Sequence, residues 1–287
     1  MEVELVKPYG FCKGVVDAIK MAKEAKIYYK DEEITILGML VHNKDVIEQL
    51  SSLGIRTIND DSKSLSELLS TIKKGVVIFT AHGHDPKLEE QATNQGLKWI
   101  DATCKYVTFN HKNILTAIEN GFEIIYICKI GHLETVATLS LSNNIYLYDV
   151  KKGLQNTPKT DKIKIFNQTT LSLLDIKDIY QELLSKYPNA IIGDEICMAT
   201  RKRQEAILNN DKNYELIIIV GDSKSNNTLS LFNIAKDKFK DSKIIRVNNL
   251  EDLLIYDISS YKTSYVLTGT STPKELADEI IKYLEKI

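Results

Sequence analysis

Leu216-Ile217-Ile218-Ile219-Val220 is the stretch that decides the fold class. An unbroken and mostly β-branched apolar run is typical of a strand buried on both faces, as parallel strands between helices are. Expected strands include Glu2–Val6, Ile34–Leu37, Val76–Thr80, Glu123–Cys128, Ile163–Phe166, Glu215–Val220 and Ser264–Thr268. Helical segments between them include Val15–Tyr29, Pro86–Gln95, Leu173–Lys186, Lys202–Asn209 and Pro273–Lys286. This alternation predicts an α/β fold with parallel sheets.

Bulk composition is that of an ordinary globular protein. The chain has 287 residues, 43% hydrophobic and 26% charged, which is enough for two or three small domains. A net charge of −2 argues against a nucleic-acid partner, and no apolar run approaches the roughly 18 residues of a membrane span. The N-terminal residues 1–5 lack the pattern of a signal peptide. We therefore expect a cytoplasmic protein with reduced thiols and no membrane partner.

Three cysteines, Cys12, Cys104 and Cys197, divide the chain into near-equal thirds, and each lies in a short polar loop ahead of an expected helix. Three α/β lobes in a pseudo-threefold arrangement could bring one thiolate each to a common centre. The expected lobes are 14–100, 101–193, and 194–287 together with the N-terminal strand 1–13. Three thiolates are one short of the usual iron–sulfur ligand set, so one iron would stay open to a substrate.

Other uses of the cysteines fit less well. Zinc sites usually contain close C-x-x-C pairs, which are absent here. Cys128 lies inside an apolar strand and is expected to be a small buried hydrophobe. The segment Asp149–Lys162 is rich in loop residues and predicts an excursion at a sheet edge.

Histidines follow the expected strands. His42, His82 and His132 each come just after one, and ligands of open α/β sheets bind beyond the carboxyl ends of strands. His84 and His111 are expected to be structural. Two residues after His132, Glu134 is the best candidate for proton transfer, although a solvated first-turn glutamate is an equally good interpretation.

Two hydroxyl-rich loops also follow strands and open helices. Pro273 suits a first helical turn, which predicts Ser271 and Thr272 at its cap. Ser225 and Asn227 can cap a helix and still donate to a phosphate. Plain capping explains either loop alone, and it also explains Thr169 and Thr170. Two such loops together with three histidines favour a phosphate or diphosphate site.

These motifs, taken in order, resemble one enzyme family, the 4-hydroxy-3-methylbut-2-enyl diphosphate reductases. The similarity covers nearly the whole chain. It is carried by residues 10–15, 41–43, 81–83, 101–104, 131–134, 167–172, 196–200, 203–205 and 269–271.

The resemblance implies three lobes around a central [4Fe–4S] cluster with Cys12, Cys104 and Cys197 as ligands. It implies reductive dehydroxylation of an allylic diphosphate to isopentenyl and dimethylallyl diphosphates, with electrons from a ferredoxin or flavodoxin. Glu134 matches the family's proton donor, and Thr169 matches the hydroxyl that positions or relays the proton. The implied diphosphate-binding residues are His42, His82, His132, Ser225, Asn226, Asn227 and Ser271.

Three residues depart from the family pattern. Lys105 and Leu133 stand where many relatives have proline, and Asn226 stands where a second serine is common. The amide of Asn226 can still donate a hydrogen bond, whereas Leu133 could shift Glu134. Two other functions remain open: a redox-neutral hydro-lyase that uses the same open iron, and a non-catalytic diphosphate-binding or iron-sensing protein.

Overall fold

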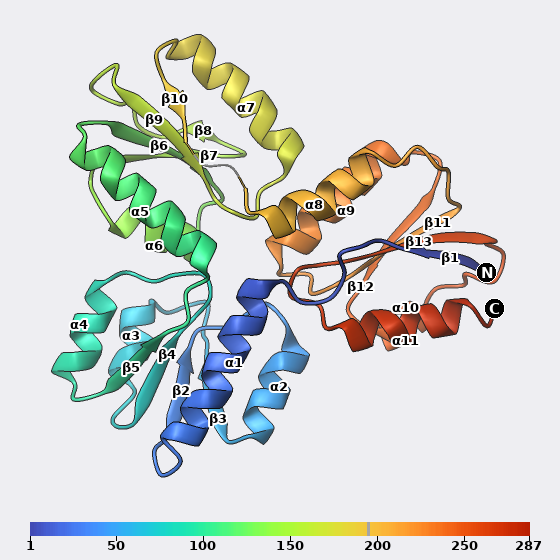
Figure 1. The fold of residues 1–287 in the computed structure, drawn as a ribbon, viewed down its shortest axis with the longest axis horizontal. Helices are drawn as coiled ribbons and strands as arrows, with labels where there is room; N and C mark the ends of the chain where they lie inside the picture. The colour runs from blue at the N-terminus through green and yellow to red at the C-terminus, as the bar shows by residue number, and fades with distance from the viewer. Residues whose placement is uncertain (194–195) are drawn as a thin grey trace. The chain divides into compact units, whose positions relative to one another are not determined.

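The described part of the chain contains three separate β-sheets, each accompanied by helices (Figure 1). The computed structural model describes residues 1–193 and 196–287. Within these residues every strand pair is parallel except one. The predicted α/β class with parallel sheets is therefore confirmed.

The first sheet is built from residues 34–101 and has the strand order β3-β2-β4-β5. Every residue of the two central strands, β2 (Ile34–Leu37) and β4 (Val76–Phe79), is buried, so their sequences show no polar alternation. The edge strands are β3 (Ile55–Ile58) and β5 (Lys98–Asp101). The accompanying helices are α1 (Lys13–Tyr28), α2 (Lys44–Ser52), α3 (Leu65–Ser70) and α4 (Lys87–Asn94).

The second sheet has the order β10-β9-β6-β7-β8. Its strands are β6 (Glu123–Cys128), β7 (Ile145–Asp149), β8 (Gly153–Leu154), β9 (Ile163–Asn167) and β10 (Ile191–Ile192), with helices α5 (Lys105–Glu119), α6 (Leu133–Ser140) and α7 (Leu173–Lys186). The short strand β8 pairs antiparallel with β7 at the sheet edge. The predicted edge excursion is therefore confirmed.

The third sheet, ordered β1-β13-β11-β12, joins the two ends of the chain. Its strands are β1 (Glu2–Leu5), β11 (Leu216–Val220), β12 (Lys243–Val247) and β13 (Thr263–Thr268), with helices α8 (Met198–Leu208), α9 (Asn226–Lys238), α10 (Leu250–Leu254) and α11 (Lys274–Leu284). All residues of β11, the apolar run that predicted the fold class, are fully buried. The parallel pairing of β1 with β13 places the N-terminal strand at the edge of this sheet.

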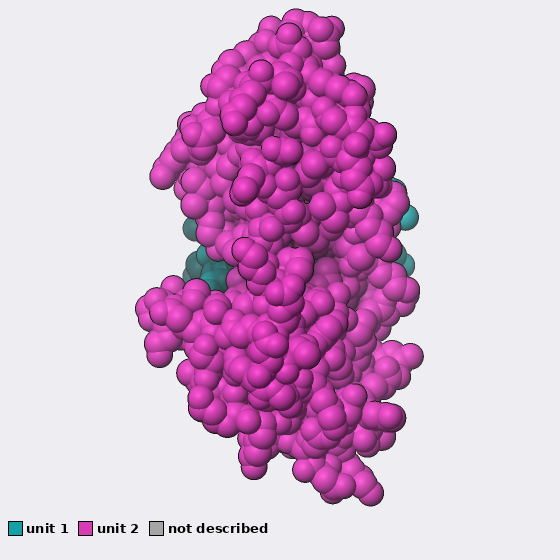
Figure 2. All heavy atoms as spheres, turned by 90° about the vertical axis from the view of Figure 1, so that its left-hand side faces the viewer, with its two compact units in different colours: residues 1–12, 170–176, 196–287 teal, residues 13–169, 177–195 magenta. Residues whose placement is uncertain are grey.

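Tertiary contacts group the chain into two compact units, coloured separately in Figure 2. Unit 1 comprises residues 1–12, 170–176 and 196–287, and unit 2 comprises residues 13–169 and 177–195. The three-lobe boundaries and their arrangement about one centre stay a prediction. Among the described helices, none has the length and apolar character needed to cross a membrane.

Candidate active site

The predicted site residues divide between the two units. Unit 2 contains Cys104, His42, His82, His132, Glu134 and Thr169. Unit 1 contains Cys12, Cys197, Ser225, Asn226, Asn227 and Ser271.

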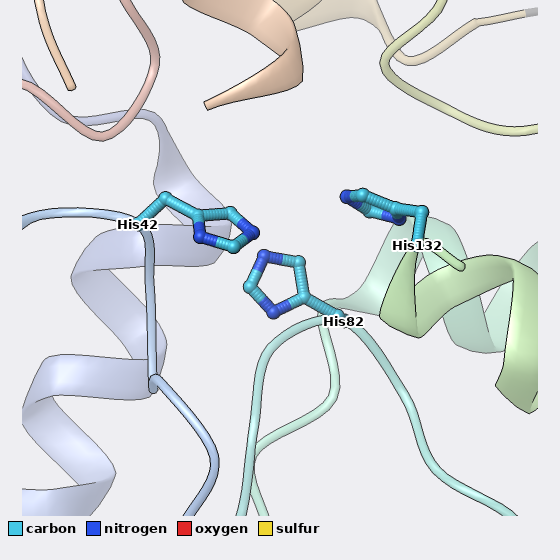
Figure 3. Close-up of side chains that lie close together, drawn as sticks. All are labelled: His42, His82 and His132. Carbon is cyan, nitrogen blue, oxygen red and sulfur yellow. The ribbon is translucent and has the colours of Figure 1, made fainter. Parts of the chain in front are cut away.

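The three strand-end histidines of unit 2 gather into one cluster (Figure 3). The ring centroids of His42 and His82 are 4.7 Å apart, and the His132 ring lies 6.0 Å and 5.6 Å from them. Each histidine follows a central strand of its sheet: β2, β4 or β6. The parallel strands therefore deliver all three side chains to one place, as the sequence predicted.

The environment keeps two of these rings uncharged at neutral pH. Burial, followed by the neighbouring rings of His42 and His132, holds the pKa of His82 well below its usual range. Burial also lowers the pKa of His132 to about 3, with smaller contributions from His42 and Lys129. Neutral imidazoles each carry one N–H donor, so the cluster can bind an anion by donating hydrogen bonds.

One hydrogen bond fixes which nitrogen of His132 carries the proton. His132 caps α6, and its Nδ1 accepts the backbone N–H of Glu134 at 3.2 Å. A neutral ring that accepts at Nδ1 must carry its proton at Nε2.

The same cluster has the spacing of a metal site. One nitrogen from each ring lies within 4.8 Å of the others. Ligation through Nε2 of His132 would require the proton to move to Nδ1, which already accepts the Glu134 N–H. This contact favours hydrogen-bond donation to an anion over coordination of a cation.

Glu134 lies in the first turn of α6 but is only 2% exposed, so the solvated interpretation is wrong. The backbone N–H of Thr169 donates to its Oε1 at 2.7 Å, and the Thr169 hydroxyl lies 2.9 Å from its Oε2. Thr169 is therefore more than a helix cap, because α7 begins only at Leu173. The Tyr126 hydroxyl lies 3.4 Å from Oε1.

Burial raises the pKa of Glu134 to about 7, against the opposing effect of the Thr169 and Tyr126 hydrogen bonds. A carboxyl group with this pKa is substantially protonated near neutral pH. It can therefore act as a general acid, which an ordinary surface glutamate cannot do efficiently. The protonatable carboxyl group lies two residues from His132 in the sequence.

Cys104, in unit 2, is joined to the segment that carries His82. It is the N-cap residue of α5, and its backbone N–H donates to the carbonyl of Ala81, the residue before His82. By contrast, Cys128 is fully buried in an apolar core, and burial raises the pKa of its thiol to about 12. The assignment of Cys128 as a buried hydrophobe is confirmed.

Cys12 and Cys197 lie in unit 1, in half-buried positions. The Cys12 backbone N–H donates to the carbonyl of Thr270 at 2.9 Å. Cys197 is the N-cap residue of α8, and its Sγ lies 3.2 Å from the hydroxyl of Thr200. A helix N-terminus favours a negative charge, so Cys104 and Cys197 both occupy positions suited to thiolate ligands.

Asn227 connects α8, which Cys197 caps, with the loop after β13 that bonds to Cys12. Its Nδ2 donates to the Thr200 hydroxyl at 3.3 Å, and its Oδ1 accepts the Thr270 backbone N–H at 2.9 Å. Thr200 is fully buried. Thr200 belongs to the motif 196–200, but the sequence predicted no role for it, because a threonine inside a helix carries no distinctive pattern.

Ser225 caps α9, where its side chain accepts the Thr228 backbone N–H at 3.4 Å. Asn226 and Asn227 then form the first turn, so this N-terminus combines amide donors with a favourable dipole for an anion. The loop after β13 approaches this turn closely: a Cβ at Gly269 would lie 2.2 Å from Thr228 Oγ1. Only glycine fits there.

The predicted cap of the last helix is wrong. Pro273, not Ser271 or Thr272, is the N-cap residue of α11, and its ψ of 149° places it outside the helix. The Thr272 hydroxyl instead donates to the Val220 carbonyl at 2.9 Å, which joins this loop to β11. Ser271 is buried in the same loop.

The residues that replace proline both occupy the first position of a helix. Lys105 opens α5 after Cys104, and Leu133 opens α6 after His132. Proline suits this position because the N–H there has no partner within the helix. In this chain leucine begins α6, and the Glu134 carboxyl group accepts the Thr169 N–H.

The two structural histidines have partners outside this cluster. His84 Nε2 lies 2.9 Å from Glu89, and its ring stacks on Phe79. His111 Nε2 lies 3.1 Å from the Thr138 hydroxyl. Their predicted structural role is consistent with these contacts.

Comparison with known proteins agrees with this geometry. A family model described as LytB protein matches residues 3–285. A relative from Malacoplasma penetrans (strain HF-2), named 4-hydroxy-3-methylbut-2-enyl diphosphate reductase, is 38% identical over 100% of this chain and 98% of its own length. A protein of the same name from Bacillus subtilis (strain 168) is 38% identical over 100% of this chain and 91% of its own length.

Among solved structures, the E-1-hydroxy-2-methyl-but-2-enyl-4-diphosphate reductase from Plasmodium falciparum is similar, with a TM-score of 0.86 and 28% identity. The similarity covers 99% of this chain and 87% of that one. Because the family match spans nearly the whole sequence and its relatives match from end to end, the chain belongs to the LytB family, the 4-hydroxy-3-methylbut-2-enyl diphosphate reductases.

Proposed function

We propose that the protein converts 4-hydroxy-3-methylbut-2-enyl diphosphate to isopentenyl and dimethylallyl diphosphates, the last step of non-mevalonate isoprenoid synthesis. The reaction consumes two electrons and two protons and releases the hydroxyl as water. The observation that carries the proposal is the buried, protonatable Glu134 next to His132, a member of the histidine cluster. Family membership agrees with it.

Hydrogen bonds would hold the diphosphate. In unit 2 the donors are the N–H groups of His42, His82 and His132. In unit 1 they are Ser225, Ser271 and the amides of Asn226 and Asn227 at the start of α9. Each hydrogen bond to a charged group contributes about 1.5–3 kcal/mol, so neutral donors suffice without a lysine or arginine cluster.

Glu134 would supply a proton to the substrate. Thr169 orients the carboxyl group through both its N–H and its hydroxyl. The 2.9 Å contact between the hydroxyl and Oε2 also provides a path along which a proton can move. Burial excludes water from the carboxyl group and keeps its proton for the reaction.

Cys12, Cys104 and Cys197 would hold a [4Fe–4S] cluster with one open iron. The chemistry of the donor set fits such a group, since each of the three is a half-buried thiol in a loop and none is paired in a disulfide. When bound, the cluster supplies the electrons and a Lewis acid for the leaving hydroxyl. A ferredoxin or flavodoxin would reduce it.

Anaerobic purification and reconstitution test this proposal. We expect a brown protein with iron–sulfur absorbance that forms both products from the allylic diphosphate and a reduced dye. A protein that stays colourless and free of iron after reconstitution would contradict the proposal. Product formation without reductant would indicate the hydro-lyase instead, and diphosphate binding without turnover would indicate a non-catalytic binding protein.

A further inference from the structure

Arg203 is a buried cation in unit 1 without an acidic partner among the residues that the structure describes. The residue, in α8, is 2% exposed. Its Nε donates to the Thr268 carbonyl at 3.1 Å, Nη1 to Ala199 at 3.1 Å and Nη2 to Gly10 at 2.6 Å. Each nitrogen of the guanidinium thus donates to a carbonyl, but carbonyls leave its full charge unbalanced, which is costly in the interior.

Two of these three carbonyls lie near a cysteine in the sequence. Gly10 is two residues before Cys12, and Ala199 is two residues after Cys197. Thr268 ends β13, two residues before the Thr270 carbonyl that accepts the Cys12 N–H. The guanidinium therefore ties α8, the helix that Cys197 caps, to the Gly10 segment ahead of Cys12 and to the end of β13.

Tight packing holds the Cys12 side of this arrangement. Gly10 has a φ of +78°, and a Cβ there would lie 2.3 Å from Cγ of Lys274. The Gly10 N–H donates to the Thr268 hydroxyl at 3.0 Å. The N–H of Gly10 therefore bonds to Thr268 and its carbonyl to Arg203, and these two bonds fix the position of the carbonyl.

The sulfur atoms of Cys12 and Cys197 are the groups that can balance the positive charge of Arg203. Burial lowers the pKa of Arg203, and the sulfur atoms of Cys12 and Cys197 oppose this effect. Arginine nevertheless stays protonated in proteins. Two thiolates bound to a cluster would supply the missing negative charge.

We infer that Arg203 is a positioning residue that supplies the fixed countercharge of the iron–sulfur group at Cys12 and Cys197 and raises its reduction potential. The inference rests on the proposed function. Reduction adds a negative charge, and a positive charge held nearby in a low-dielectric interior stabilises the reduced state more than the oxidised state.

Redox titration of the anaerobically reconstituted full chain tests the inference. At a fixed potential, Arg203→Gln should lower the ratio of reduced to oxidised cluster at least tenfold, which is 59 mV for a one-electron couple. Arg203→Lys keeps the charge and should change the ratio less than about threefold. Arg201→Gln is the matched control: it removes the same charge from α8, but Arg201 is 24% exposed and pairs with Glu205.

A wild-type ratio in loaded Arg203→Gln would overturn the inference. If Arg203→Gln does not fold or does not bind the cluster, Arg203→Lys is the deciding variant. A ratio of reduced to oxidised cluster within about threefold of wild type in Arg203→Lys would support the role of the charge. Failure of Arg203→Lys to bind the cluster, or a tenfold loss in that ratio, would overturn the inference. Absence of an iron–sulfur spectrum from the wild-type protein would instead contradict the proposed function itself.

Discussion

Glu134 shows how surroundings alter the chemistry of a single residue. Three hydrogen-bond donors surround the carboxyl group, but burial outweighs them and raises its pKa to about 7. In the described part of the chain, the groups that affect this pKa are Thr169 and Tyr126, both uncharged. A nearby cation would have stabilised the ionised form and removed the proton that the reaction needs.

Replacing this carboxyl group should stop the reaction. Glu134→Gln keeps the shape and the Thr169 contact but cannot release a proton, so we expect turnover to fall about 10²–10⁴-fold. Diphosphate binding, measured by calorimetry on the oxidised protein, should change little. Glu119→Gln, on the exposed end of α5, is the control. Turnover near the wild-type rate in Glu134→Gln would remove Glu134 from the mechanism.

The pH dependence of turnover should report the same group. Burial raises the Glu134 pKa from 4.5 to about 7, so the acid form is lost as pH rises through about 7. At saturating substrate, kcat should fall about tenfold per pH unit above that value. A kcat profile that stays flat to about pH 9 would contradict this assignment.

The raised pKa of Glu134 also contributes to the free energy of unfolding. This contribution is fully present below the unfolded pKa of 4.5 and is lost as pH rises through the folded pKa of about 7.

At the scale of helices and strands, several predicted site residues lie at the N-terminus of a helix. Cys104, His132, Cys197 and Ser225 are the N-cap residues of α5, α6, α8 and α9. Each helix thus begins at a predicted site residue and directs its free N–H groups toward that end. This arrangement suits anionic groups such as thiolates and a diphosphate.

The position of Leu133 at the start of α6 leads to a matched pair of substitutions. Leu133→Pro should keep turnover within about twofold, because the first helical N–H has no partner within the helix. Val136→Pro, one turn later, removes the bond from its N–H to the His132 carbonyl at 3.0 Å and should cost about 3 kcal/mol. Thermal unfolding and turnover of both variants measure the difference. Equal losses in the two would show that α6 begins elsewhere.

Sequence patterns predicted central elements better than their boundaries. Central strands such as β2 and β11 are buried on both faces, so their apolar runs are visible without any tertiary information. The start of α8 was expected at Lys202 but lies at Met198, because Cys197 caps the helix. The cap at Pro273 was misplaced because Thr272 bonds to a strand carbonyl distant in sequence.

At the scale of the whole molecule, the sheet of unit 1 combines both ends of the chain. Strand β1 pairs with β13, and β13 pairs with β11 near the middle of that sheet. Ile218 is fully buried in β11 and registers with Val266 of β13 and Ile245 of β12. The core of unit 1 therefore depends on segments far apart in sequence.

Truncating this central side chain should destabilise the protein strongly. Ile218→Ala leaves a cavity in the core and should cost about 2–5 kcal/mol, measured by urea unfolding followed by circular dichroism. Ile255→Ala removes the same atoms from a residue that is 81% exposed and should change stability by less than about 0.5 kcal/mol. Similar effects of the two substitutions would contradict the central position of β11.

Taken alone, the sequence determined the α/β class, the strand-end histidines, the three candidate cluster cysteines and the family. These features depend on local residue patterns and their order, which the linear chain displays directly. Only the tertiary structure decided that Glu134 is buried against Thr169 and that Arg203 is a buried cation beside two cysteine loops. Burial and hydrogen bonding depend on which distant segments pack together, and in a protein interior they set the charge state on which the chemistry depends.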